Sequence, residues 1–165
     1  MIGHRWGVTD AEVERAYPCD DLMPGAQLQI WRGVSVQAPA ERVWPWLCQV
    51  QLAPYSYDWI DNFGHRSPRR LLGRPDPQPG ERFSLVGGRF PVGQVLAVEH
   101  GRHLTATIMG ALMSYVLVPD GAGTRLLLKI VIKRRNWLSQ ALALGDWPMA
   151  RRQLLNFKAH AEGSG

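Results

Sequence analysis

The sequence predicts one α+β domain in which a curved antiparallel sheet of about six or seven strands holds a long C-terminal helix. Three observations support this. The chain has 165 residues, enough for one well-buried domain and too few for two ordinary ones. Its second half begins with a long stretch that alternates apolar and polar residues, as strands do. It then ends in a segment of helical spacing whose apolar stripe can cover one face of the sheet.

The first 26 residues precede the sheet and are predicted to contain one short helix, over residues 9–16. Thr9 and Glu12 fit a capping box, because the Thr9 hydroxyl can accept from the Glu12 amide while the Glu12 carboxylate reaches back. Pro18 is expected to end this helix, because proline lacks the amide proton that a helix interior uses.

Residues 27–37 form the first predicted strand of the sheet. Four apolar side chains share one face of it: Leu28, Ile30, Val34 and Val36. This alternation is typical of a half-buried strand. Arg32 lies on the same face, so it needs a structural partner, an anionic ligand or a strand twist that carries it to the edge.

Two short helices are predicted to follow this strand. The first covers residues 39–51 and has an apolar stripe made by Val43, Trp44, Leu47 and Val50. Ser56 can cap a second helix over residues 56–63, which Gly64 would end. Residues 64–80 are rich in proline, glycine and arginine and predict a loop.

Strands and one long helix make up the rest of the chain. We place strands at residues 81–86, 90–99, 104–109, 112–118 and 124–134. The turns between them are too short for parallel crossovers, so antiparallel pairing is expected. After a loop or helical turn at residues 137–145, Asp146 can cap a helix over residues 147–162. The apolar stripe of this helix comprises Trp147, Ala150, Leu154, Phe157 and Ala161.

Four segments of the sequence carry a family resemblance. They are residues 34–47 (VSVQAPAERVWPWL), 55–62 (YSYDWIDN), 95–104 (VLAVEHGRHL) and 149–155 (MARRQLL). These segments resemble one bacterial branch of the SRPBCC superfamily, also called START-like or Bet v 1-like, which includes proteins named polyketide cyclase or dehydratase. The resemblance implies a helix-grip fold with an apolar cavity between the sheet and the last helix. It is less specific about function, since the superfamily includes lipid carriers, polyketide binders and enzymes.

The chain is therefore divided into an extension with a short helix (residues 1–26), one helix-grip ligand-binding domain (residues 27–162) and a tail (residues 163–165). The sequence shows no signal peptide and no stretch of 18 apolar residues, so we expect a cytoplasmic protein without a membrane span. Whether it is a monomer or a homodimer stays open.

The sequence contains no motif for a metal, a cofactor or covalent catalysis. Only two of its five histidines, His100 and His103, lie near each other. Cys19 and Cys48 have no CxxC spacing, and no serine lies in a GxSxG motif. We therefore expect no metal site and no cofactor.

The formal net charge of +5 permits an anionic partner without requiring one. Basic residues cluster at positions 66, 69, 70 and 74 and again at 133–135, 151 and 152. Neither cluster is interleaved with aromatic residues as single-strand-binding surfaces are, so the sequence argues against nucleic acid as a partner. Three interpretations of the basic clusters remain: a solvated surface, contact with anionic lipid headgroups, or an acidic protein partner.

Candidate ligand-binding residues are those expected near the cavity: Arg32, Tyr55, Tyr57, Trp59, Thr105, Thr107, Tyr115, Trp147 and Leu154. Candidate acid/base residues are Tyr57, Asp58, Asp61, His65 and His103. Each has a structural alternative. Asp58 can stabilise a helix N-terminus, Asp61 can pair with a loop arginine, and His103, Thr105 and Thr107 share a strand face that solvent can cover as well.

Three hypotheses about function follow. The first is non-covalent binding of a hydrophobic or aromatic small molecule, such as a lipid, polyketide or isoprenoid-like metabolite, in the cavity. The second is a cyclase- or dehydratase-like enzyme that uses general acid/base catalysis there. It predicts that at least two of six residues, the five acid/base candidates and Arg32, converge in the cavity. The third is a protein-interaction module that uses the basic surface.

Overall fold

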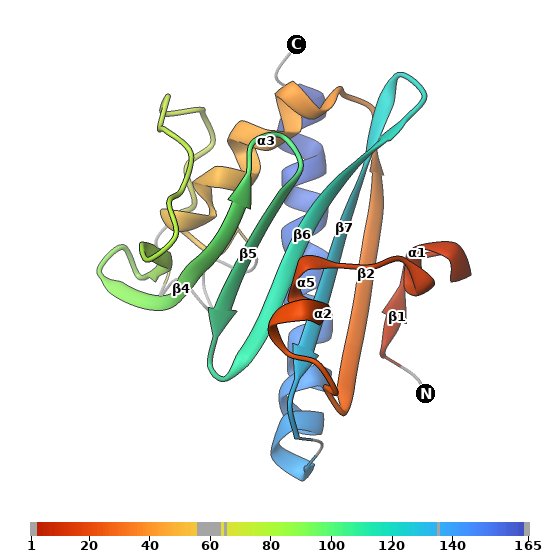
Figure 1. Cartoon of the computed structure of the whole chain (residues 1–165). Helices are drawn as coiled ribbons and strands as arrows, with labels where there is room; N and C mark the ends of the chain where they lie inside the picture. The colour runs from red at the N-terminus through yellow and green to blue at the C-terminus, as the bar shows by residue number, and fades with distance from the viewer. Residues whose placement is uncertain (1–2, 56–63, 65, 135, 164–165) are drawn as a thin grey trace.

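A seven-stranded sheet is the central element of the computed structural model, which describes residues 3–55, 64, 66–134 and 136–163, except the side chains of residues 138–140 and 142–147. The strand order is β1-β2-β7-β6-β5-β4-β3 (Figure 1). The strands are β1 (Arg5–Trp6), β2 (Leu28–Val36), β3 (Arg82–Val86), β4 (Phe90–Glu99), β5 (His103–Ile108), β6 (Ala111–Asp120) and β7 (Gly123–Ile132). The predicted α+β fold, with its long C-terminal helix on the sheet, is confirmed.

The strand β1 makes the sheet mixed instead of purely antiparallel. It pairs parallel to β2, with Arg5 opposite Trp31 and Trp6 opposite Arg32, whereas every other neighbouring pair is antiparallel. A strand of two residues has no alternation from which it could be predicted. The segment between β1 and β2 is long enough to make the crossover that parallel pairing needs.

The N-terminal segment contains two helices instead of the predicted one. Helix α1 (Asp10–Glu14) has the predicted capping box: the Glu12 amide donates to the Thr9 hydroxyl (3.2 Å), and the Thr9 amide donates to the Glu12 carboxylate (2.9 Å). Pro18 begins helix α2 (Pro18–Leu22) instead of only ending α1. Proline suits the first turn of a helix, where its missing amide proton has no partner to lose.

Of the two helices predicted after the first long strand, the described residues contain the first. Helix α3 (Ala40–Cys48) continues into the 3₁₀ helix η1 (Gln49–Gln51). The second prediction, residues 56–63, lies outside the described residues. The C-terminal helix α5 (Trp137–Gly163) begins well before the predicted start at residue 147, so the predicted loop or turn at residues 137–145 is helical. The helix runs through Pro148, although proline is more usual in the first turn of a helix.

The two faces of the sheet are covered by different parts of the chain. Helix α5 packs on the inner face, and the N-terminal segment with α1 and α2 lies on the outer face (Figure 1). Alternation along each strand sends every second side chain to the inner core, which includes Ile30, Leu104, Tyr115, Leu126 and Leu128 together with Leu154 and Phe157 of α5. A second, smaller apolar cluster on the outer face joins Tyr17 and Cys19 to Leu112, Val116, Leu127 and Val131.

Candidate ligand-binding cavity

A cavity of about 220 Å³ lies between the inner face of the sheet and α5. Strand residues such as Phe83, Met113 and Leu128 form one wall, and Met149 and Ala150 of α5 form another. The small side chain of Ala150 faces this space on the helix stripe, where a larger residue would fill it. The sequence thus leaves apolar space at the place that the resemblance implied.

The strands β3 and β4 form the side of the cavity away from β2. Gly93 adopts a φ of +67°, and a Cβ atom there would lie 2.0 Å from the carbonyl oxygen of Thr107 on β5. Only glycine permits this close approach of β4 to β5. The approach positions Val86 and Val92 in the cavity wall.

One hydrogen-bonded chain of polar groups crosses the otherwise apolar lining. The Tyr115 hydroxyl donates to Oε1 of Gln153 (2.6 Å), and Nε2 of Gln153 donates to the carbonyl oxygen of Pro54. Ser84, a further polar residue of the described lining, donates to the carbonyl oxygen of Val50 (2.6 Å). A serine hydroxyl oxygen that donates in this way can also accept a hydrogen bond from a ligand.

None of the described residues that line the cavity carries a charged side chain. Burying a charged group without an opposite charge costs far more than burying a neutral polar group. The lining therefore favours an uncharged ligand, or the uncharged part of a larger one. Tyr115 and Gln153 are the polar groups that could orient it.

Of the predicted ligand-binding residues, Tyr115 lines this cavity. Leu154 is fully buried in the inner core next to the lining residue Gln153. Tyr55 is also buried, beside the ring of Phe157 (centroids 5.3 Å apart), and its hydroxyl donates to the carbonyl oxygen of Pro68 (2.7 Å). Leu154 and Tyr55 support the cavity region as core residues and are not in its lining.

Arg32 is fully buried on the inner side of β2, as its phase in the strand predicts. Its Nη1 donates to the carbonyl oxygens of Trp31 (2.9 Å) and His4 (3.2 Å). These carbonyl groups are a structural partner, the first of the alternatives that the sequence left open for Arg32. Arg32 is not part of the cavity lining.

Three predicted site residues on β5 face away from the cavity, so their expected inward placement is corrected. Thr105 pairs with Ser114 across the strands, and the two hydroxyl oxygens lie 2.8 Å apart on the outer face. Thr107 and His103 share that face, because they lie two residues to either side. A shift of one residue in register decides the face, and alternation alone does not say which face is inner.

His103 instead lines a shallow surface groove of about 510 Å³ on the outer side of the sheet. Its Nε2 lies 3.6 Å from a carboxylate oxygen of Glu99, and Arg102 lies 3.5 Å from the same carboxylate group. Arg15 contributes from the N-terminal segment. These groups neutralise each other in part, and no described candidate joins His103 there.

The remaining candidates, Tyr57, Asp58, Trp59, Asp61 and His65, lie outside the described residues, as does the side chain of Trp147. The second hypothesis required at least two acid/base candidates, or one with Arg32, in the cavity. Neither of the described ones, His103 and Arg32, is in its lining.

Sequence reasoning missed Gln153 and the methionines of the lining. Gln153 follows Ala150 by three positions, so it lies beside the apolar stripe of α5. That spacing was a usable signal, because a buried amide next to an apolar stripe requires partners. Met113 alternates in phase with Tyr115 on β6 and could have been found in the same way.

Both cysteines of the chain, Cys19 and Cys48, are buried. Burial raises the pKa of the Cys48 and Cys19 thiols, which keeps both in the weakly reactive protonated form. Within the described ranges, no three His, Cys, Asp or Glu side chains gather as metal ligands would. No helix in the described part of the chain is long and apolar enough to cross a membrane.

No model of a known family matches the sequence, and no curated protein matches it. Solved structures match over most of the chain. A protein of Mesorhizobium loti is 20% identical with a TM-score of 0.57, over 83% of this chain and 98% of its own. An AHSA1-like protein from Aeromonas hydrophila is 21% identical with a TM-score of 0.54, over 84% and 94%.

A third match is DynU16, a protein of the dynemicin biosynthetic locus. It is 19% identical with a TM-score of 0.51, over 77% of this chain and 46% of its own. Identities this low establish a shared fold and leave function to the site itself. The chain shares the α+β fold of these structures, with a long C-terminal helix on a curved sheet, and this is the fold that the sequence resemblance implied.

Proposed function

We propose that this protein binds an uncharged hydrophobic or aromatic small molecule non-covalently in the cavity under α5. The supporting observation is the cavity of about 220 Å³, with an apolar lining that one polar chain from Tyr115 through Gln153 to Pro54 crosses. Lipids, polyketides and isoprenoid-like metabolites combine a large apolar surface with a few hydroxyl or carbonyl groups. Burial of the apolar surface supplies affinity, and the polar chain selects the orientation.

The cavity also explains why the ligand would be held without covalent chemistry. Its lining offers a phenol, an amide and a hydroxyl, each already bonded to a protein group. Such groups recognise a neutral carbonyl or hydroxyl by sharing hydrogen bonds. The acid/base hypothesis gains no support from the described residues, so we do not propose a reaction.

The test is binding of the uncharged aromatic probe N-phenylnaphthylamine, followed by its fluorescence. Ala150→Phe places a ring in the cavity and should weaken binding by about tenfold, the equivalent of roughly two buried methylene groups of the ligand. Ala159→Phe is the matched control, because Ala159 lies on the exposed side of the same helix. It should leave the affinity unchanged.

Circular dichroism and thermal unfolding are the controls that check whether both variants fold. The proposal fails if the unaltered protein does not bind the probe, or if the two variants bind it equally well. A negatively charged probe of similar size, anilinonaphthalene sulfonate, should bind more weakly than the neutral one. Equal affinity for the two probes would contradict the argument from the uncharged lining.

A further inference from the structure

Exposed apolar side chains gather at one end of the sheet. Met109 is 80% exposed, Trp137 is 79% exposed and Phe90 is 55% exposed. They are half of the six large apolar side chains that are exposed in the described part of the chain. Leaving these side chains in water has a cost in free energy, so their gathering at one end calls for an explanation.

Strand pairing places these three residues at the same end. Ile132, the last residue of β7, pairs with Leu28 and with Ala111, and Ala111 pairs with Ile108 just before Met109. The β3–β4 hairpin points the same way, because β4 runs antiparallel to β5. We call this part of the molecule the cavity end and define it as the described residues within 86–92, 108–112 and 132–137, which leaves out residue 135.

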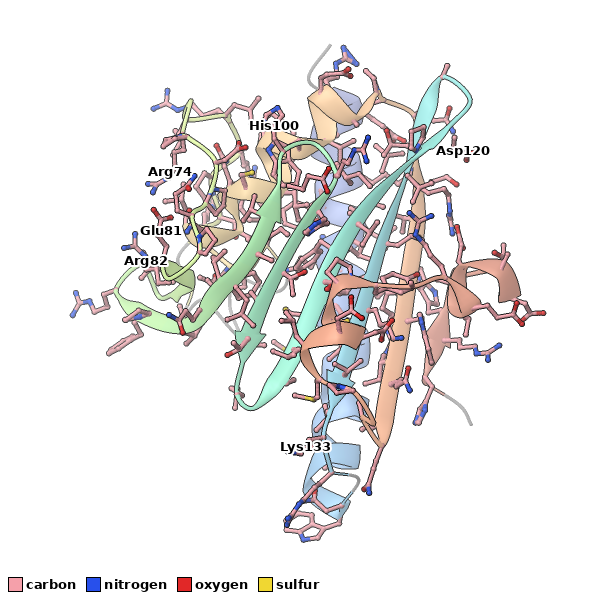
Figure 2. The ribbon with its side chains drawn as sticks, viewed as in Figure 1. Arg74, Glu81, Arg82, His100, Asp120 and Lys133 are labelled. Atoms are coloured by element: carbon pink, nitrogen blue, oxygen red, sulfur yellow. The ribbon has the colours of Figure 1, made fainter. Side chains whose placement is uncertain are left out.

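The cavity end is basic. Its three segments contain no aspartate or glutamate, and the exposed residues Arg89, Lys133 and Arg134 lie in them. At the other end of the sheet, the turns carry Glu99 and Asp120. Figure 2 shows Lys133 at the opposite end of the molecule from His100 and Asp120.

The cavity end also adjoins the cavity. Met109, although mostly exposed, is one of the lining residues, and Val86 and Val92 of the β3–β4 hairpin line it as well. Met109 therefore belongs both to the rim of the cavity and to the exposed apolar side chains of this end. A hydrophobic molecule that leaves an apolar phase at this end would meet the lining directly.

We propose that the cavity end docks on a lipid bilayer whose surface carries anionic headgroups. Trp and Phe side chains suit the boundary between headgroups and acyl chains, and Lys and Arg are attracted to the negative surface. The three apolar side chains come from three separate places in the chain: the start of β4, the turn between β5 and β6, and the start of α5. A fluid interface admits such separate side chains, whereas a folded protein partner would need a matched pocket for each.

The test is sedimentation of the full chain with vesicles of phosphatidylcholine alone or mixed with phosphatidylglycerol. The mixed vesicles should bind the protein, and added salt should weaken binding by screening the charges. Each basic residue near such a surface contributes about a fivefold factor, so Lys133→Gln with Arg134→Gln should lower the affinity by about 25-fold. Trp137→Ser should lower it further, by an amount that salt does not change, because insertion of an apolar side chain is not screened.

The matched control is Arg70→Gln with Arg74→Gln. It removes the same charge from another exposed basic stretch, in which the side chains of Leu71 and Leu72 are also exposed. This control should keep nearly full affinity. Equal losses in the two double variants, or vesicle binding that none of the substitutions changes, would overturn the proposal.

Two further outcomes would overturn the docking proposal. No binding of the unaltered protein to mixed vesicles contradicts the proposal. Binding to an acidic polypeptide such as polyglutamate, without binding to vesicles, would replace the bilayer by an acidic protein partner and would also overturn it. Docking is independent of the proposed ligand binding, because the probe assay contains no vesicles, so either proposal can fail alone.

Discussion

The inner and outer faces of the sheet are closed by opposite means. On the inner face, α5 packs apolar side chains against apolar strands and leaves a cavity of about 220 Å³. On the outer face, the N-terminal segment is tied down by polar and charged contacts around a small apolar cluster. One sheet thus has a loosely filled side and a tightly bonded side.

The bonded side depends on two ion pairs from β7 to the N-terminal segment. Arg125 binds Glu12 through two contacts, Nε to Oε1 (2.7 Å) and Nη2 to Oε2 (2.8 Å). Lys129 pairs with Asp20, and its Nζ lies over the rings of Tyr17 (5.3 Å) and Trp31 (5.1 Å). Because they are paired in this way, Arg125 and Lys129 can be covered by the N-terminal segment although they lie on a central strand of the sheet.

The comparison shows where a ligand can be accommodated at low cost. An empty space on the outer face would leave ionic and polar groups without partners. The N-terminal segment covers that face and supplies those partners. On the inner face, an empty apolar space costs only lost packing contacts, which a hydrophobic ligand restores. The face with fewer specific bonds is therefore the one suited to binding.

The largest expected effect comes from the packed part of the inner face. Leu154→Ala should lower the free energy of unfolding by about 2–5 kcal/mol, because the side chain is fully buried between α5 and the sheet. Urea denaturation measures this. Leu155→Ala is the control on the same helix, since Leu155 is only partly buried, and should cost clearly less. Equal losses would mean that α5 does not pack on the sheet through Leu154.

Ser114 tests the outer face. Its hydroxyl oxygen accepts from the Cys19 amide (3.0 Å) and lies 2.8 Å from the hydroxyl of Thr105. Ser114→Ala should cost about 1–3 kcal/mol, because it leaves a buried amide without an acceptor. Hydrogen exchange should show the Cys19 amide exchanging faster. Unchanged protection at that amide would contradict a bonded outer face.

The pair of Glu12 and Arg125 makes this face sensitive to acid. The hydrogen bonds from Arg125 hold the pKa of the Glu12 carboxyl below its ordinary value of 4.5. Stabilisation from a lowered pKa is fully present above the ordinary value and is lost as pH falls through the lowered one. At neutral pH, Glu12→Gln should cost about 1 kcal/mol.

The measurement is the free energy of unfolding of both proteins from neutral pH downward. The difference between them should shrink below the ordinary pKa of glutamate, because the unaltered protein loses the ion pair there. A difference that stays constant to the lowest pH would show that the ion pair does not stabilise the fold. Asp10→Asn is a suitable control, since the Asp10 side chain is 91% exposed.

Tyr115 should give the smallest effect on stability, although it is next to Ser114 and equally buried. Tyr115→Phe removes the donor to Gln153, at a cost of about 1 kcal/mol or less, because the group borders a cavity that can hold water. Chemical denaturation compares it with Ser114→Ala. A larger loss for Tyr115→Phe than for Ser114→Ala would reverse the comparison of the two faces.

Much of the fold could be predicted because alternation is a local property. Every strand from β2 to β7 agrees with its predicted range to within a few residues, and the capping box at Thr9 is present as the spacing required. The N-terminal strand β1 and the start of α5 could not be predicted in this way. A two-residue strand has no period, and Pro148 is a residue typical of a helix start, although α5 begins at Trp137.

The candidate site was less predictable, because a strand pattern gives two faces without saying which one is inner. Of the candidates on β5 and β6, Tyr115 lines the cavity, whereas Thr105 and Thr107 lie on the other face. The choice depends on what covers each face, and a segment distant in sequence decides that. The polar partners of Gln153 likewise come from β6 and from Pro54, far from α5 in the chain.

The sequence by itself determined where the strands follow one another along the chain, that the C-terminal helix is amphipathic, and that no metal or nucleophile motif is present. These features depend on neighbours a few residues apart. Only the tertiary structure decided that the N-terminal segment closes one face and that apolar space remains under the other. It also brought Phe90, Met109 and Trp137 to one basic end. The physical reason is that burial and charge pairing are relations between distant segments, which no local pattern contains.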